Sequence, residues 1–269
     1  MSRIIIISFF LLTNCTICFA QHTAQHKLNA LKLQLKTRLT FLEKYNYWTN
    51  QDFDVDKYSE KTAVLLTNLL KQRPIDSNSF KNFNNLSLSA KTNDSLQVHI
   101  YHFGFNSGGS RGWITHPVIQ WRDRNGVHYA YNLSRNINCR FNQIHKLTGT
   151  SGNLYILIGS EKGNSSTIQN IAYVIKIDEK NMFLNYKAFI NRSSINLPNS
   201  EFSFNDKTQT LKCISDMENE KFTLHLENIK PAEDTTATRK LLQMFSREYD
   251  EPICMKFIKG KFVRQTKCR

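Results

Sequence analysis

The fold is decided by residues 113–133, which read WITHPVIQWR-DRNG-VHYAYNL. Both flanks are rich in β-branched and aromatic residues, which favour strands. Between them, Asn125-Gly126 is the strongest short signal for a tight β-hairpin. Pro117 has no backbone N–H to give to a sheet, so we expect its run to be an edge strand or to carry a bulge. The stretch therefore predicts antiparallel pairing between strands that are neighbours in the sequence.

The same pattern continues on both sides of this stretch. Apolar and polar residues alternate over 96–101, and further strand-like runs cover 141–147, 153–159 and 171–177. A last hairpin is expected around Lys259-Gly260. Tight turns recur without crossover helices, which predicts roughly ten short strands in an antiparallel meander. A sandwich, a barrel and an irregular propeller all fit this pattern.

Two helices are expected before the strands and one after most of them. Residues 27–48 carry leucines at three- and four-residue steps, which is typical of an amphipathic helix. A second helix, 57–72, follows Asp54 or Asp56 as its N-cap, and a late helix fits 235–249. The predicted fold class is α+β: an N-terminal helical hairpin packed on a mostly antiparallel β-meander, with one late helix.

The first twenty residues have the three parts of a secretory signal peptide. Arg3 precedes the apolar run Ile4–Leu12, and a small-x-small pattern ends at Ala20. The run is shorter than the about 20 residues of a membrane span, so we expect cleavage rather than an anchor and no transmembrane span in the mature chain. An uncleaved anchor and a lipoprotein attached at Cys15 are the alternatives. The expected location is secreted or periplasmic, in the cell envelope.

Beyond the leader of residues 1–20, the expected organisation is a helical segment over 21–75 and a β-rich domain over 76–269. The chain carries 36 Lys and Arg against 22 Asp and Glu, a formal net charge of +14. Such a charge attracts an anionic glycan, a lipid surface or an acidic secreted protein, although it also serves solubility alone. The basic face of the first helix fits an anionic membrane, but a core helix with a solvated basic back is the favoured interpretation. No specific nucleic-acid motif is present.

Four cysteines remain once the leader is removed. An even number of cysteines in an exported chain indicates disulfides. Three pairings are possible, and we favour Cys254 with Cys268 and Cys139 with Cys213. No C-x-x-C pair occurs in the mature chain, so a structural zinc site is not expected.

One glycine-rich loop, residues 104–113, invites a binding hypothesis. Backbone amides freed by glycine can surround an anion, and an arginine can add a charged fork. Tryptophan rings offer stacking faces for a sugar or a base. The candidate ligand-binding residues are Gly108, Gly109, Arg111, Trp113, Trp121 and Arg122. A plain hairpin connection with turn glycines is the alternative.

Catalytic and metal-binding motifs are absent from the sequence. It has no G-x-S-x-G and no H-E-x-x-H, and Asp52-x-Asp54-x-Asp56 lacks the glycine and glutamate of a calcium loop. We therefore expect no metal and no cofactor, and a non-catalytic binding or envelope-associated protein. The alternative is a secreted hydrolase that combines distant residues, such as His102 and His116 with a turn carboxylate.

The order of these parts resembles uncharacterised secreted β-rich proteins of the Bacteroidota type. The matching pieces are Phe19-Ala20-Gln21, Val98-His99-Ile100-Tyr101 leading to Gly108-Gly109, residues 154–159 and residues 203–211. The resemblance implies bacterial export and a β-rich fold. It implies no activity and no catalytic residues.

Overall fold

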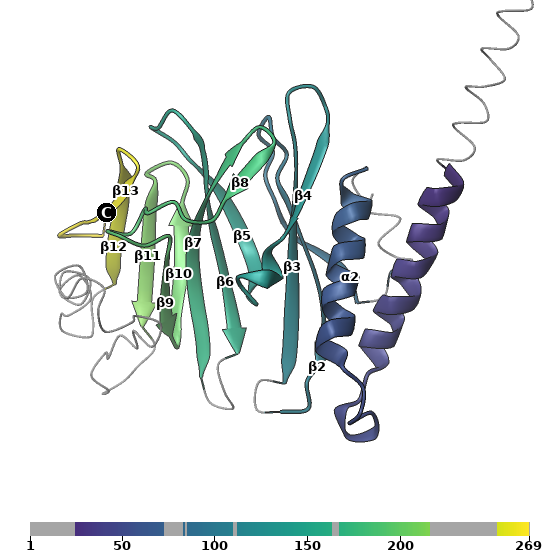
Figure 1. The fold of residues 1–269 in the computed structure, drawn as a ribbon. Helices are drawn as coiled ribbons and strands as arrows, with labels where there is room; N and C mark the ends of the chain where they lie inside the picture. The colour runs from purple at the N-terminus through teal and green to yellow at the C-terminus, as the bar shows by residue number, and fades with distance from the viewer. Residues whose placement is uncertain are drawn as a thin grey trace, which may run out of the picture.

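A computed structural model shows helices and sheets arranged in successive layers (Figure 1). The described residues are 25–72, 83, 85–109, 112–162, 167–215 and 252–268. The expected leader, the expected late helix over 235–249 and Arg111 lie outside them. The described part contains two α-helices and three antiparallel sheets, which confirms an α+β fold with a β-rich core. The choice among sandwich, barrel and propeller stays a prediction.

The helical layer consists of a helix over residues 25–44, the short η1 (Tyr47–Thr49) and α2 (Val55–Leu70). Asp54 is the N-cap of α2, and its side chain accepts a hydrogen bond from the backbone N–H of Lys57 at 2.9 Å. The leucine face of the first helix is buried against α2 and the first sheet. The favoured interpretation of a core helix with a basic solvated back is therefore confirmed. No helix in the described ranges combines the length and hydropathy needed to cross a membrane.

The first sheet has the strand order of the sequence. Its strands are β1 (Ser87–Lys91), β2 (His99–Asn106), β3 (Trp113–Arg122) and β4 (His128–Asn132), and the turn η2 (Leu133–Arg135) follows. The predicted hairpin is present, with Arg122 opposite His128. Asp123 closes it by accepting hydrogen bonds from the backbone N–H groups of Asn125 and Val127, both at 2.9 Å.

Pro117 corrects one expectation, because its strand is not an edge strand. β3 pairs with β2 on one side and β4 on the other. The pairing with β4 begins only at Val118, opposite Asn132, whereas Pro117 itself lies opposite His102 of β2. The short length of β4 therefore leaves Pro117 with a partner strand on one side alone, as a residue without an N–H requires.

Two further sheets complete the stack. The second contains β5 (Arg140–Leu147), β6 (Asn153–Lys162), β7 (Ile168–Asp178) and β8 (Asn181–Phe183), and β9 (Ser194–Pro198) also pairs with β7. The third contains β10 (Ser200–Asn205), β11 (Thr210–Ser215), β12 (Ile253–Ile258) and β13 (Lys261–Arg264). The hairpin around Lys259-Gly260 joins β12 to β13, as expected.

In the described part of the chain, three apolar cores separate four layers. One lies between the helices and the first sheet, one between the first and second sheets, and one between the second and third sheets. In β6, Leu154, Ile156 and Ile158 belong to the last of these cores, while Tyr155 and Leu157 belong to the middle one. Successive residues of a strand point to opposite faces. The second sheet is thus covered on both faces, which explains the uninterrupted apolar run 154–158.

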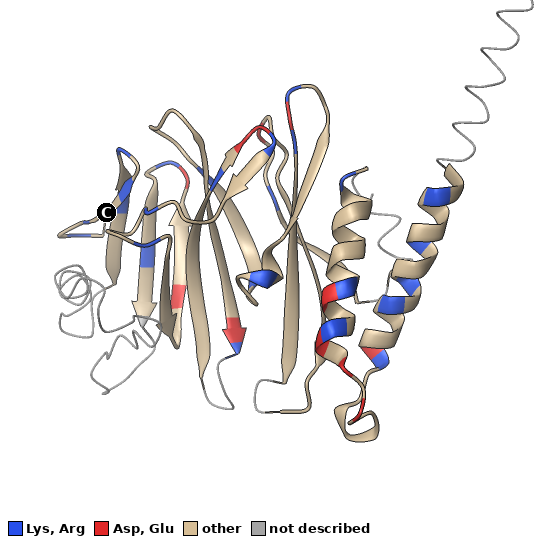
Figure 2. Cartoon of the chain, in the orientation of Figure 1, with Lys and Arg blue, Asp and Glu red and all other residues tan. Residues whose placement is uncertain are grey.

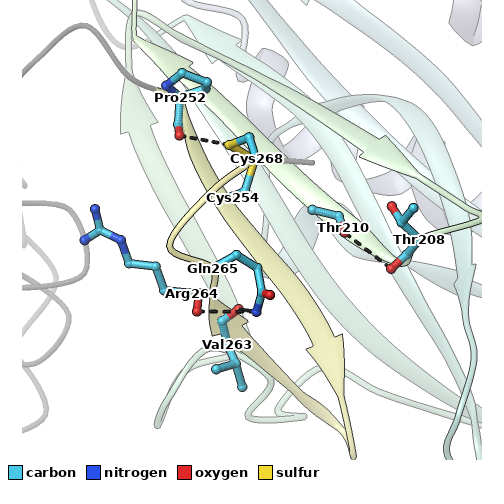
Figure 3. The surroundings of a disulfide bond; sticks show 8 residues. All are labelled: Thr208, Thr210, Pro252, Cys254, Val263, Arg264, Gln265 and Cys268. Atoms are coloured by element: carbon cyan, nitrogen blue, oxygen red, sulfur yellow. Dashed lines mark hydrogen bonds between the residues drawn. A yellow bond between two sulfur atoms is a disulfide. The ribbon is translucent and has the colours of Figure 1, made fainter.

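The disulfide expectation is half right. Cys254 and Cys268 form a bond that ties the chain after β13 back to β12, with Cα atoms 5.3 Å apart (Figure 3). The second expected pair is not formed, because Cys139 and Cys213 are buried free thiols. Cys139 lies in the core between the first and second sheets, and Cys213 in the core between the second and third. The second sheet lies between the two side chains. The spacing of the cysteines along the sequence does not reveal this separation.

Candidate functional site

A pocket of about 310 Å³ opens between the first sheet and the start of β5. We call it the Trp113 pocket. It is lined by Asn85, Leu86, Ser87, His102, Phe103, Trp113, Thr115 and Arg140. The hydroxyl of Ser89 in β1 donates to the carbonyl oxygen of Phe141 in β5 at 2.7 Å, which holds the two walls together.

Strand register places the polar pocket residues His102 of β2 and Thr115 of β3 on the face that looks toward β5. Residues directly opposite each other in an antiparallel pair share one face, and successive residues alternate. His102 lies opposite Pro117 and Gly104 opposite Thr115. His116 lies opposite Phe103 and therefore faces the helices. The structure thus does not bring His102 and His116 together, as a hydrolase built on both would require.

Gly104 makes room for the indole that forms one side of the pocket. A Cβ atom at this position would collide with Nε1 of Trp113 and with the carbonyl oxygen of Ile114. The side chain of Asn85 bonds both backbone groups of Gly104, donating to its carbonyl oxygen and accepting from its N–H at 3.3 Å. Trp113 remains 47% exposed although it packs on this backbone. It therefore presents ring surface to a ligand.

His102 is the most buried of the polar residues described in the lining of the pocket. It is 3% exposed, and its Nε2 accepts a hydrogen bond from the backbone N–H of Phe141 at 3.0 Å. Burial, followed by the positive charge of Arg140, lowers the pKa of His102 to about 3. The ring is consequently neutral at physiological pH.

The described residues that line the pocket include several hydrogen-bond donors and no carboxylate. Arg140 supplies a cation, Thr115 a hydroxyl and Trp113 an indole N–H. Outside the lining, Nζ of Lys162 lies near the residue that precedes Trp113, 3.7 Å from the position that a Cβ on Gly112 would take. The arrangement fits a ligand that carries negative charge and hydrogen-bond acceptors. Elsewhere the positive charge is spread, for example along the helix of residues 25–44 (Figure 2).

The two tryptophans proposed from the sequence have different environments. Trp113 lines the pocket, whereas Trp121 is 3% exposed, stacks on Tyr129 and donates from Nε1 to the carbonyl oxygen of Glu179 at 2.6 Å. Trp121 is therefore a core residue, and the expectation of a second stacking face is wrong. Arg122 ends β3 opposite His128, at the other end of the strand from Trp113.

The glycine-rich loop does not offer free amides at two of its glycines. The N–H of Gly108 donates to Oδ1 of Asn106 at 3.0 Å, and the N–H of Gly112 donates to the carbonyl oxygen of Gly109 at 2.9 Å. Gly108 has a φ of +72°, and a Cβ there would lie 2.6 Å from Cβ of Tyr47. Position 108 therefore requires glycine for two reasons: its φ is positive, and Tyr47 of η1 packs against it. Gly109 is exposed at the loop tip.

Six of the eight lining residues were not proposed from the sequence: Asn85, Leu86, Ser87, Phe103, Thr115 and Arg140. For Phe103 and Thr115 the signal was the register of β2 and β3, which follows from pairing the two runs across the glycine-rich loop. Asn85 and Arg140 reach the pocket through contacts between elements that are distant in the chain. Such contacts leave no local pattern in the sequence.

A histidine–carboxylate pair exists away from the pocket. Nδ1 of His145 lies 3.0 and 3.1 Å from the two carboxylate oxygens of Asp206, and its Nε2 lies 3.3 Å from Oε1 of Gln143. Asp206 is 65% exposed, so this pair sits at the surface. Within the described ranges, no three His, Cys, Asp or Glu side chains are grouped to hold a metal ion.

Comparisons of the chain with protein-family models, with curated proteins and with solved structures found no match. The pocket therefore carries the functional argument.

Proposed function

We propose that this chain is an exported, non-catalytic binding protein whose Trp113 pocket holds one residue of an acidic glycan. One observation carries the proposal: a cation and several donors line the pocket beside an exposed indole, and no carboxylate is among the described residues that line it. An indole face packs against the apolar face of a sugar ring, and guanidinium binds carboxylate with charge-assisted, bidentate hydrogen bonds. The volume of about 310 Å³ suits a small ligand.

Export is supported by two features of different kinds. Residues 1–20 have the composition of a signal peptide, and the bond between Cys254 and Cys268 is of a type that persists in oxidising compartments. The resemblance to secreted β-rich proteins of the Bacteroidota type agrees with both. We interpret the architecture as a helical hairpin packed on a layered, sandwich-like meander, because separate apolar cores lie between successive layers.

The test is isothermal titration calorimetry with D-glucuronate, using D-glucose as the neutral counterpart. We expect glucuronate to bind at least ten-fold more tightly than glucose, and its affinity to fall as NaCl is raised from 20 to 150 mM. Trp113→Ala and Arg140→Gln should each weaken glucuronate binding at least ten-fold.

Matched controls come from the same chain. Trp48 is 69% exposed in η1, and Arg124 is exposed in the β3–β4 turn. Trp48→Ala and Arg124→Gln should leave the affinity unchanged. Equal binding of the two sugars, or equal effects of pocket and control variants, would refute the proposal.

A further inference from the structure

Thr115 brings to the Trp113 pocket a hydroxyl group that has no hydrogen-bond partner among the described residues. The residue as a whole is 7% exposed. The fully buried side-chain nitrogen and oxygen atoms that lack a partner in the described ranges belong to Arg38, His102 and His116. The hydroxyl oxygen of Thr115 also lacks a partner but is not one of these buried atoms, so it keeps accessible surface. Because the residue lines the pocket, a ligand atom there can reach this oxygen.

The position of Thr115 is next to the indole of Trp113. Thr115 lies opposite Gly104, and directly opposite residues of an antiparallel pair have Cβ positions about 5 Å apart. Gly104 has no side chain, and the edge of the Trp113 indole occupies the space where its Cβ would stand. Trp113 and Thr115 are two residues apart in β3, so both side chains lie on one face. A ring that packs on the indole therefore has its substituents near the Thr115 hydroxyl.

The other uncharged polar groups of the described lining are less suited to bind a ligand. Both polar groups of the Asn85 side chain are bonded to the backbone of Gly104. Nε2 of His102 accepts a backbone hydrogen bond, and its Nδ1 is buried. Ser87 is exposed and belongs to β1, two strands away from β3. Thr115 is thus the hydroxyl that combines a sheltered position beside the indole with an unused bonding capacity.

We propose that Thr115 determines the specificity of the Trp113 pocket by forming a hydrogen bond with a ring hydroxyl group of the bound acidic sugar. This inference rests on the proposed function. A threonine hydroxyl both donates and accepts, as a sugar hydroxyl does, whereas the guanidinium of Arg140 only donates and binds the carboxylate. A site built to bond a ligand hydroxyl discriminates against an analogue without it, because the polar group of the site is then left unpaired.

The experiment compares D-glucuronate with tetrahydropyran-2-carboxylate by isothermal titration calorimetry. Both have a six-membered ring with a carboxylate beside the ring oxygen, but the second has no hydroxyl groups. The unaltered protein should bind glucuronate at least ten-fold more tightly. Thr115→Val replaces the hydroxyl by a methyl group and should weaken glucuronate binding about five-fold, the effect of one neutral hydrogen bond. It should change the affinity for the analogue less than two-fold.

Two further variants test the hydroxyl itself. Thr115→Ser keeps the hydroxyl and should hold the glucuronate affinity within two-fold of the unaltered protein. The matched control is Thr210→Val in β11 of the third sheet, where the hydroxyl donates to the carbonyl oxygen of Thr208 at 3.3 Å. It should leave both affinities unchanged. If Thr115→Val does not fold, Thr115→Ala removes the hydroxyl without adding a methyl group and should have the same selective effect.

The outcomes separate this inference from the proposed function. Arg140→Gln should weaken both ligands, because both carry the carboxylate. If it does so while removal of the Thr115 hydroxyl weakens both ligands equally or neither of them, the role of Thr115 alone is overturned. Equal affinity of the unaltered protein for the two ligands has the same meaning. Absence of glucuronate binding to the unaltered protein overturns both.

Discussion

His116 is buried in the core between the helices and the first sheet, where its ring stacks on Phe103 with centroids 5.1 Å apart. Neither ring nitrogen has a hydrogen-bond partner among the described residues. Burial lowers the pKa of His116 to about 4. The position therefore tolerates a neutral ring and penalises a charged one.

This predicts an acid-sensitive contribution to stability. The pKa of His116 is about 4 in the folded state, against 6.5 for the free side chain, so the unfolded chain takes up the proton first as the pH falls. The folded state then loses about 3 kcal/mol between pH 6.5 and 4 through this residue. His116→Phe should unfold in urea at the same or higher concentration at pH 7.5 and show a smaller loss at pH 4.5. An equal loss in both proteins would contradict the assignment.

At the residue scale, the sequence predicts which face of a strand a side chain lies on better than it predicts whether that side chain is exposed or buried. Trp113 and Trp121 sit eight residues apart in one strand and have the same parity, so both point to one face. One remains 47% exposed and the other 3%, because the second sheet covers only the part of that face around Trp121. Layer packing decides the difference, and no local pattern reports it.

At the scale of elements, local signals were the most reliable. The hairpin of residues 113–133, the Asp54 N-cap and the turn at Lys259-Gly260 all follow from turn and capping chemistry within a few residues. The edge-strand expectation for Pro117 failed because it depends on the length of β4, which belongs to another part of the chain.

The cysteines give a prediction at the element scale. Without residues 1–20, the native protein should show no thiol reactive toward Ellman's reagent, because Cys139 and Cys213 are buried and burial raises the pKa of both thiols. Unfolding in guanidinium without reductant should expose two thiols. A count of zero would restore the Cys139–Cys213 pair, and a count of four would remove the bond between Cys254 and Cys268.

The same bond should stabilise the third sheet. Replacing both Cys254 and Cys268 by Ser should lower the free energy of unfolding by about 3 kcal/mol, the chain-entropy value for a loop of this length. Cys213→Ala serves as a comparison, since it removes a buried thiol and leaves the cross-link intact. Equal midpoints of urea unfolding for the double variant and the unaltered protein would contradict the prediction.

At the scale of the whole molecule, polar bonds also join the layers. The hydroxyl of Tyr155 in β6 donates to Oδ2 of Asp94, which precedes β2, and Nζ of Lys146 lies 3.1 Å from the same oxygen. Burial alone would raise the pKa of Asp94, but the bonds from Tyr155, Thr92 and Lys146 outweigh it and lower the pKa. The first and second sheets are thus tied by a charged network at the rim of their shared core.

Removing one partner should show how much this tie contributes. Tyr155→Phe leaves Asp94 with fewer donors and should lower stability at pH 7 by about 1–3 kcal/mol. Since the pKa of Asp94 is lowered in the folded state, its contribution is present above the unfolded pKa near 3.8 and lost as the pH falls below it. The cost of Tyr155→Phe should therefore shrink at pH 3. Tyr131→Phe, whose hydroxyl makes a 3.3 Å bond at the surface, should cost less at either pH.

The stacking of layers was the part of the fold least visible in the sequence. Alternation of apolar and polar residues identifies strands that have one solvent-exposed face. The run 154–158 lacks this alternation because both faces of β6 are covered. The sequence identifies this run as a strand but does not indicate what packs on each of its two faces. The Trp113 pocket forms where two layers meet, so its location was hidden for the same reason.

The doubly covered β6 also has a consequence for the chain before it folds. A strand with no solvent-exposed face cannot carry charged side chains. Residues 154–158, Leu-Tyr-Ile-Leu-Ile, are accordingly uncharged and rich in residues that favour β-strands. Short segments of this composition nucleate amyloid-like assembly when they are exposed. The unfolded chain exposes this segment until the neighbouring sheets form. Slow formation of those sheets would therefore favour aggregation through this segment.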